Sequence, residues 1–75
     1  MNDFSEFEGF EVEEISENSI KIFKGERWVQ VVLDSPYCKY RIMVSNDRGR
    51  IVETTDIASI ARQAILYYLQ TGNVI

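Results

Sequence analysis

The chain has 75 residues, of which 45% are hydrophobic, and its formal net charge is −4. This length predicts one small domain with a modest core, so we expect a second copy of the chain to add stability as a homodimer. The sequence contains no histidine and one cysteine, Cys38, which removes the commonest general base and metal ligand. We therefore expect a protein that is not an enzyme and that binds no cofactor or metal.

The cellular setting follows from the same composition. A single cysteine excludes an intramolecular disulfide and favours a reducing cytoplasm, where Cys38 would be an incidental thiol. No apolar run approaches the roughly 20 residues that span a bilayer, and the acidic beginning of the chain is unlike a signal peptide. The sequence therefore predicts a cytoplasmic location without membrane attachment.

The charge is distributed unevenly along the chain. Residues 1–18 contain seven acidic side chains and no basic one, whereas residues 19–75 contain eight basic and five acidic side chains. Within the first segment, Phe4, Phe7 and Phe10 recur at intervals of three, and Gly9 interrupts them. We interpret residues 1–9 as an acidic, aromatic arm and residues 10–75 as a single α+β domain.

After the arm, five short runs rich in β-branched and aromatic residues predict strands. Turn residues separate them: Glu17-Asn18, then Gly25-Glu26 with glycine at the first central position, then a loop with Pro36, then a glycine-containing turn at 46–50. The expected strands are 10–16, 19–24, 27–34, 39–45 and 50–54.

These turns set an expected register for an antiparallel meander. Cross-strand pairs of this register are Ile15 with Ile20, Val12 with Phe23, Phe23 with Trp28, Leu33 with Tyr40, Val44 with Val52 and Ile42 with Thr54. The four hairpins agree, because together they collect one aliphatic face. This face holds Ile15, Ile20, Ile22, Val29, Val31, Leu33, Tyr40, Ile42, Val44 and Val52.

The last element is a helix expected over 56–70, with Thr55 or Asp56 as its cap and Gly72 at its end. Its apolar stripe is expected to pack on the aliphatic face, which predicts an α+β fold with one C-terminal helix on one side of a five-strand sheet (β-β-β-β-β-α). Leu66 and Tyr67 lie off the stripe, so this end is covered either by the tail Val74-Ile75 or by a dimer contact. The stripe comprises Ile57, Ile60, Ala61, Ala64, Ile65, Tyr68 and Leu69.

The sheet face away from the helix, which we name the open face, is unusually apolar for a surface that meets water. We expect this face to be covered by the Phe4/Phe7/Phe10 arm, by a second copy of the chain or by another macromolecule. The expected members of the open face are Val12, Glu14, Lys21, Phe23, Trp28, Gln30, Val32, Arg41, Met43, Ser45, Ile51 and Glu53.

Three functions are compatible with these surfaces. The first is a small acidic protein-binding module, a regulator or inhibitor that occupies a basic site on a larger nucleic-acid-handling complex. The second is a nucleic-acid-binding module that uses Lys21, Arg41, Arg48 and Arg50 beside its aromatic rings. The third is a structural homodimeric subunit. For the first function the expected partner-binding residues are Phe23, Trp28, Val32, Met43, Glu6, Glu8, Glu11 and Glu13.

Overall fold

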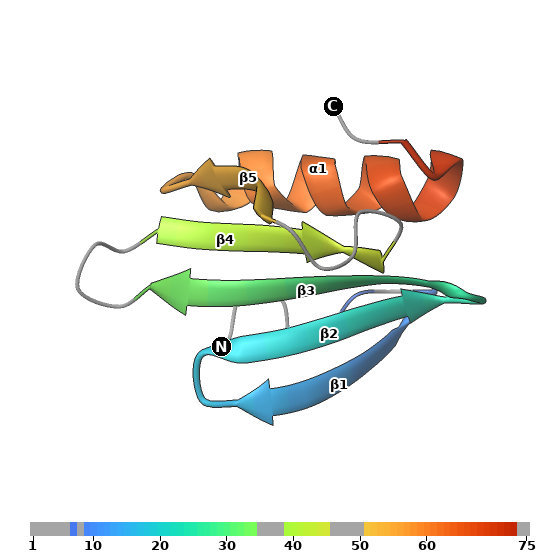
Figure 1. Cartoon of the computed structure of the whole chain (residues 1–75), viewed down its shortest axis with the longest axis horizontal. Coiled ribbons are helices and arrows are strands. Elements are labelled where there is room, and N and C mark those ends of the chain that lie inside the picture. The colour runs from blue at the N-terminus through green and yellow to red at the C-terminus, as the bar shows by residue number, and fades with distance from the viewer. Residues whose placement is uncertain (1–6, 8, 35–38, 46–50, 74–75) are drawn as a thin grey trace.

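A five-stranded antiparallel sheet and one C-terminal helix make up the computed structural model, so the α+β fold expected from the sequence is confirmed (Figure 1). The structure describes residue 7 and residues 9–34, 39–45 and 51–73. Each strand pairs with the next strand along the chain, which makes the sheet a meander. The elements are β1 (Glu11–Ser16), β2 (Ser19–Lys24), β3 (Arg27–Asp34), β4 (Lys39–Val44), β5 (Ile51–Thr55) and α1 (Ala58–Thr71).

The register of the three central strands agrees with the turn chemistry. Phe23 lies opposite Trp28 in the β2–β3 hairpin, and Leu33 lies opposite Tyr40 between β3 and β4, as expected. Gly25 has a φ of 59°, the positive value that the first position of this tight turn requires. The loop at 35–38, which contains Cys38, lies outside the described residues.

The expected register between β1 and β2 is wrong by one residue over most of β1. A β-bulge between Glu14 and Ser16 leaves Ile15 without a partner, so that Val12 lies opposite Ile22. Ile15 is consequently 46% exposed and lies outside the core. The shift is favourable because it turns Val12 toward the helix side of the sheet, where it packs against the core.

A similar irregularity shifts the register between β4 and β5. Ile42 lies opposite Glu53, where the sequence predicted Thr54, and Met43 lies opposite Ile51. Glu53 therefore shares the helix side with Ile42, which corrects its expected place on the open face, while Ile51 lies on the open face as expected. The turn at 46–50 and the side chain of Val52 lie outside the described residues.

The helix begins later than the sequence predicted. Its N-cap is Ile57, which has extended backbone and makes no side-chain cap hydrogen bond, so the expected cap at Thr55 or Asp56 is wrong. The Thr55 hydroxyl instead accepts the N–H of Ile57 at 3.1 Å in the turn before the helix. At the other end, the helix stops as expected at Gly72, which has a φ of 78° and donates its N–H to the Tyr68 carbonyl at 2.7 Å.

Arg27 of β3 supplies the positive charge that the last turn of α1 lacks. Its Nη1 donates to the carbonyl oxygen of Leu69 at 3.1 Å, where unpaired carbonyls carry the negative end of the helix dipole. The same guanidinium group lies beside Gly72, so close that a Cβ added to this glycine would lie 2.9 Å from Arg27 Nη2. The end of the helix is thus fixed against the β2–β3 hairpin.

Replacing Gly72 by alanine should lower the free energy of unfolding by about 1–2 kcal/mol, because the left-handed conformation disfavours a side chain and Arg27 must move. Gly25→Ala is the matched control, since Gly25 also has a positive φ but nothing lies within 4 Å of its added Cβ. Chemical denaturation of both variants measures the difference. Equal losses for the two variants would show that the contact with Arg27 contributes nothing.

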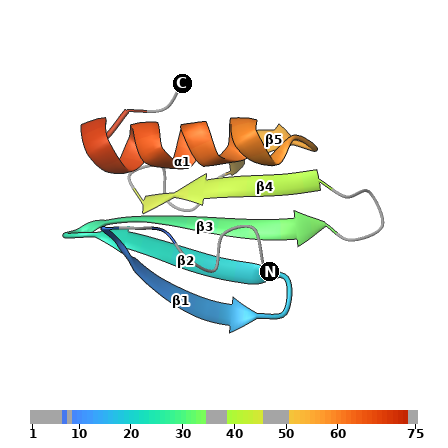
Figure 2. The same cartoon turned by 180° about the vertical axis from the view of Figure 1, so that it is seen from behind.

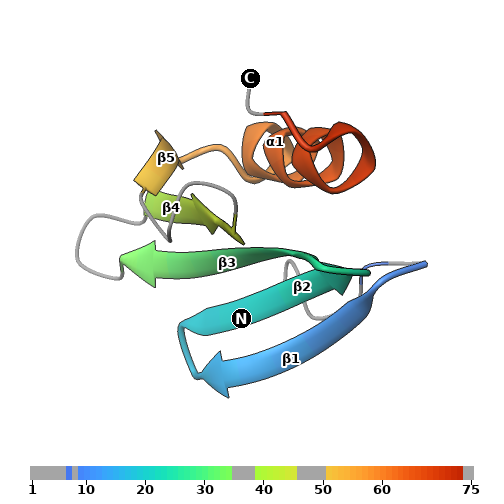
Figure 3. The same ribbon diagram turned by 45° about the vertical axis from the view of Figure 1, so that its right-hand side comes forward.

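The helix packs on the part of the sheet formed by β3, β4 and β5. Seen from behind, α1 lies in front of β5 (Figure 2), and a third view shows it away from β1 and β2 (Figure 3). The expected stripe is confirmed except at Ile57 and Ile60, which are 49% and 42% exposed. The buried core consists of Phe7, Ile20, Ile22, Val29, Val31, Tyr40, Ile42, Val44, Ala61, Ile65, Tyr68 and Leu69.

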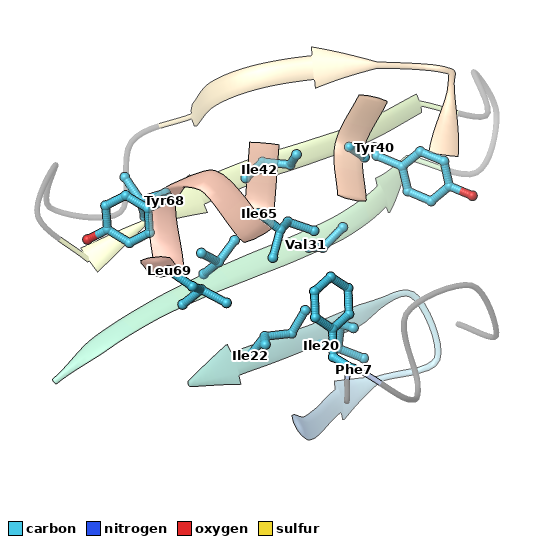
Figure 4. Close-up of a cluster of buried hydrophobic side chains, with 12 residues drawn as sticks. Phe7, Ile20, Ile22, Val31, Tyr40, Ile42, Ile65, Tyr68 and Leu69 are labelled. Atoms are coloured by element: carbon cyan, nitrogen blue, oxygen red, sulfur yellow. The ribbon is translucent and has the colours of Figure 1, made fainter. Parts of the chain in front are cut away.

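Phe7 covers the part of this face that the helix leaves open. One helix about 10 Å wide cannot cover five strands spaced about 4.8 Å apart, so β2 needs another cover. Phe7 is 5% exposed and lies over Ile20 and Ile22, on the same side of the sheet as α1 (Figure 4). The Phe7 and Phe10 rings meet in an edge-to-face arrangement with centroids 5.9 Å apart, and the guanidinium carbon of Arg62 lies 4.8 Å from the centroid of the Phe7 ring.

Candidate protein-binding face

Because Phe7 lies on the helix side, it does not cover the open face. No helix or strand of the described residues packs against that face (Figure 1). Its side chains follow from the alternation along each paired strand. They are Glu11, Glu13 and Ser16 of β1, Ser19, Lys21 and Phe23 of β2, Trp28, Gln30, Val32 and Asp34 of β3, Lys39, Arg41 and Met43 of β4, and Ile51 and Thr54 of β5.

An aromatic pair forms one end of this face. Phe23 and Trp28 lie directly opposite each other, and both side chains are half-buried. The ammonium nitrogen of Lys21 lies 4.5 Å from the centroid of the Trp28 ring, a cation–π contact. The indole ring is therefore held by its neighbours and still reachable from solvent.

Polar side chains hold the middle of the face in place. Asp34 Oδ2 accepts from Arg41 Nη2 at 2.8 Å and from Arg41 Nε at 3.2 Å. Gln30 Nε2 donates to the hydroxyl of Ser19 at 2.9 Å. These part-buried pairs fix side-chain positions around Val32 and Met43 before any ligand arrives.

The backbone of Trp28 is anchored to the helix through one hydroxyl group. Ser45 Oγ accepts the N–H of Trp28 at 3.1 Å and lies 2.8 Å from the hydroxyl oxygen of Tyr68, which α1 buries in the core. The position of Trp28 is therefore set by the core packing as well as by the sheet. A rigid platform of this kind loses little conformational entropy on binding.

The bulge brings acidic side chains to the same face. With the register shifted, Glu13 lies opposite Lys21 and Glu11 lies opposite Phe23. A surface pocket of about 400 Å³ adjoins this corner. Its lining consists of Gly9, Phe10, Glu11, Phe23, Lys24 and Gly25.

The structure brings most of the expected partner-binding residues together on one face. Phe23, Trp28, Val32 and Met43 lie on the central strands, and Glu11 and Glu13 lie on β1 next to them. Glu6 and Glu8 lie outside the described residues. The bulge moved Val12 and Glu14, both expected on the open face, to the helix side.

The sequence carried a signal for this bulge. Phe10, just before β1, and Val12 within it are apolar at even positions, whereas Ile15 of β1 is apolar at an odd position. A regular strand cannot place all three side chains on one face. The bulge leaves Ile15 unpaired and outside the core, while Phe10 and Val12 pack against it.

The cations proposed for nucleic-acid binding are already engaged where the structure describes them. Lys21 contacts the Trp28 ring, and Arg41 pairs with Asp34. Arg48 and Arg50 lie outside the described residues. Lys21, Lys39 and Arg41 are matched on the open face by Glu11, Glu13 and Asp34, so this face lacks the positive excess that phosphate binding uses.

Comparison with known proteins finds no match among protein-family models, curated proteins or solved structures. Within the described residues, no three side chains of the metal-binding types gather into a candidate metal site, and no helix is long and apolar enough to cross a membrane. Function therefore has to be inferred from the chemistry of the open face.

Proposed function

We propose that this chain is a non-catalytic protein-binding module whose open face docks a partner protein. The observation that carries the proposal is the position of Phe7, which packs with the helix and leaves Phe23 and Trp28 uncovered by the described residues. Tryptophan, phenylalanine and methionine are the residue types enriched at the centres of protein interfaces. Val32 and Met43 extend this apolar area across β3 and β4.

The acidic border supports a partner with a basic surface. Glu11 and Glu13 flank the aromatic pair, and Glu11 also lines the pocket beside Phe23. A carboxylate next to two aromatic rings suits the guanidinium or ammonium group of an incoming arginine or lysine. Complementary charge of this kind accelerates encounter and excludes acidic competitors.

An acidic and aromatic border fits a basic partner surface of the kind that binds phosphates. We therefore propose that the chain is a cytoplasmic regulator or inhibitor of a nucleic-acid-handling complex. The acidic side chains of residues 1–18 would add to the attraction. Direct binding of nucleic acid is the alternative, and the matched charges of the open face disfavour it.

Photocrosslinking tests the proposal in living cells. A photoreactive phenylalanine analogue at Val32 on the open face should trap a protein at a defined mass, whereas the same analogue at Glu14, exposed on the helix side of β1, should not. The trapped protein should then bind the purified chain, with an affinity that falls as salt concentration rises. Equal trapping at both positions, or trapping of nucleic acid from Val32, would refute the proposal.

A further inference from the structure

The helix carries a second apolar stripe, of which only Ala64 packs partly against the core. Ile57, at the N-cap, and Ile60, Ala64 and Tyr67, within α1, follow the alternating spacing of three and four residues that aligns side chains along one flank. Ile57 is 49% exposed, and Ile60 and Tyr67 are each 42% exposed. The core uses different positions of the same helix, among them Ile65 and Leu69.

The contact of Arg62 with Phe7 shows which way this stripe faces. Phe7 lies over β2, so Arg62 marks the flank of α1 turned toward β2. At about 100° per residue, Ile60 lies roughly 160° around the helix from Arg62. The stripe therefore runs along the flank away from β2, toward the edge of the sheet formed by β5 (Figure 3).

The surface of α1 is almost free of charge. Arg62 is the one charged residue among the fourteen of the helix, and the other side chains around the stripe, such as Ser59, Gln63 and Gln70, are polar and neutral. A chain with a net charge of −4 is repelled overall by a second copy of itself. The α1 flank is where that repulsion is weakest and apolar area is available.

We propose that α1 packs against α1 of a second copy of this chain in an antiparallel pair. Two large side chains of the stripe lie on either side of Ala64: Ile60 four residues before it and Tyr67 three residues after it. A two-fold axis near Ala64 sets Ile60 of one copy against Tyr67 of the other, and the small side chain at the crossing lets the axes approach to about 8–10 Å. The open face takes no part in this contact, so the dimer presents two copies of it.

The solution mass of the full chain tests the dimer. Light scattering on wild type should give twice the monomer mass of 8.7 kDa. Ile60→Glu should weaken dimerisation about 100-fold or more, because it places an unpaired charge in the apolar contact. Ser59→Glu is the control: it adds the same charge one residue earlier, off the stripe, and should remain dimeric. Both changes lie in the first helical turn, where a negative charge favours the helix.

A cysteine probe checks the position of the axis. In a Cys38→Ser background, Ala64→Cys should form a disulfide-linked dimer on mild oxidation, whereas Ser59→Cys should not. A monomeric wild type, or an Ile60→Glu variant that dimerises as well as wild type, would overturn the proposal. Loss of the dimer in Trp28→Ala but not in Ile60→Glu would assign self-association to the open face, and crosslinking from Val32 would then trap the chain itself.

Discussion

Replacing Phe7 by alanine is expected to lower the free energy of unfolding by about 3–5 kcal/mol, the range for truncating a buried aromatic residue. The ring is 5% exposed and covers Ile20 and Ile22, so its loss opens a cavity above β2. It also removes the contacts with Phe10 and Arg62. A domain of this size has a total stability of about 4–11 kcal/mol, so the variant should be near the limit of folding at 37 °C.

Urea denaturation of the wild type, Phe7→Ala and Phe7→Leu measures this effect. Leucine keeps an apolar side chain over β2 and should recover more than half of the loss. Arg62→Ala should cost about 0.5–1 kcal/mol through loss of the cation above the ring. A loss below about 1 kcal/mol for Phe7→Ala would mean that the arm is dispensable for the core.

Trp28→Ala is expected to weaken binding of the protein trapped from Val32 by about 30- to 1,000-fold, the range for truncating a hot-spot residue at an interface centre. The indole ring belongs to the aromatic end of the open face. Lys21 contacts the ring, and the Ser45 hydroxyl accepts the backbone N–H of Trp28. Circular dichroism should show the same secondary structure as the wild type, because the ring lies outside the buried core. Calorimetric titration of the purified pair supplies the affinity.

Two adjacent glutamates provide the matched charge test for the same interface. Glu13 lies on the open face and Glu14 lies on the helix side, although both are exposed residues of β1. Glu13→Lys should therefore reduce the affinity about tenfold or more, and Glu14→Lys should change it little. The opposite order would show that β1 binds in the unbulged register or that the interface lies elsewhere.

The central strands could be predicted from the sequence because each has two neighbours that fix its register. The Gly25 turn and the pairing of Leu33 with Tyr40 agree with one buried face, and a slip of one residue would expose it. Both edge strands deviated, at Ile15 in β1 and next to Ile42 in the β4–β5 pair. An edge strand pairs on one side only, so a bulge disrupts a single ladder and is tolerated there.

The buried side of the helix and the position of the arm could not be predicted from the sequence. The apolar residues of α1 cover more of its circumference than the sheet can bury, so the sequence could not tell that Ile65 would be buried and Ile60 exposed. The arm has aromatic residues without strand or helix periodicity, and nothing in the sequence alone assigns Phe7 to one face of the sheet. The residues of the open face were predicted because alternation in the central strands determines them, whereas Glu11 and Glu13 joined it through the bulge.

Phe7 packs on the helix side of the sheet, and this position decides whether the open face is free to bind. Nuclear Overhauser contacts from the Phe7 ring protons test it directly in the full chain. The structure predicts contacts with the methyl groups of Ile20 and Ile22, and none with the indole of Trp28. Contacts from Phe7 to Trp28 or Met43 would show that the arm covers the open face, and the proposed protein-binding site would be withdrawn.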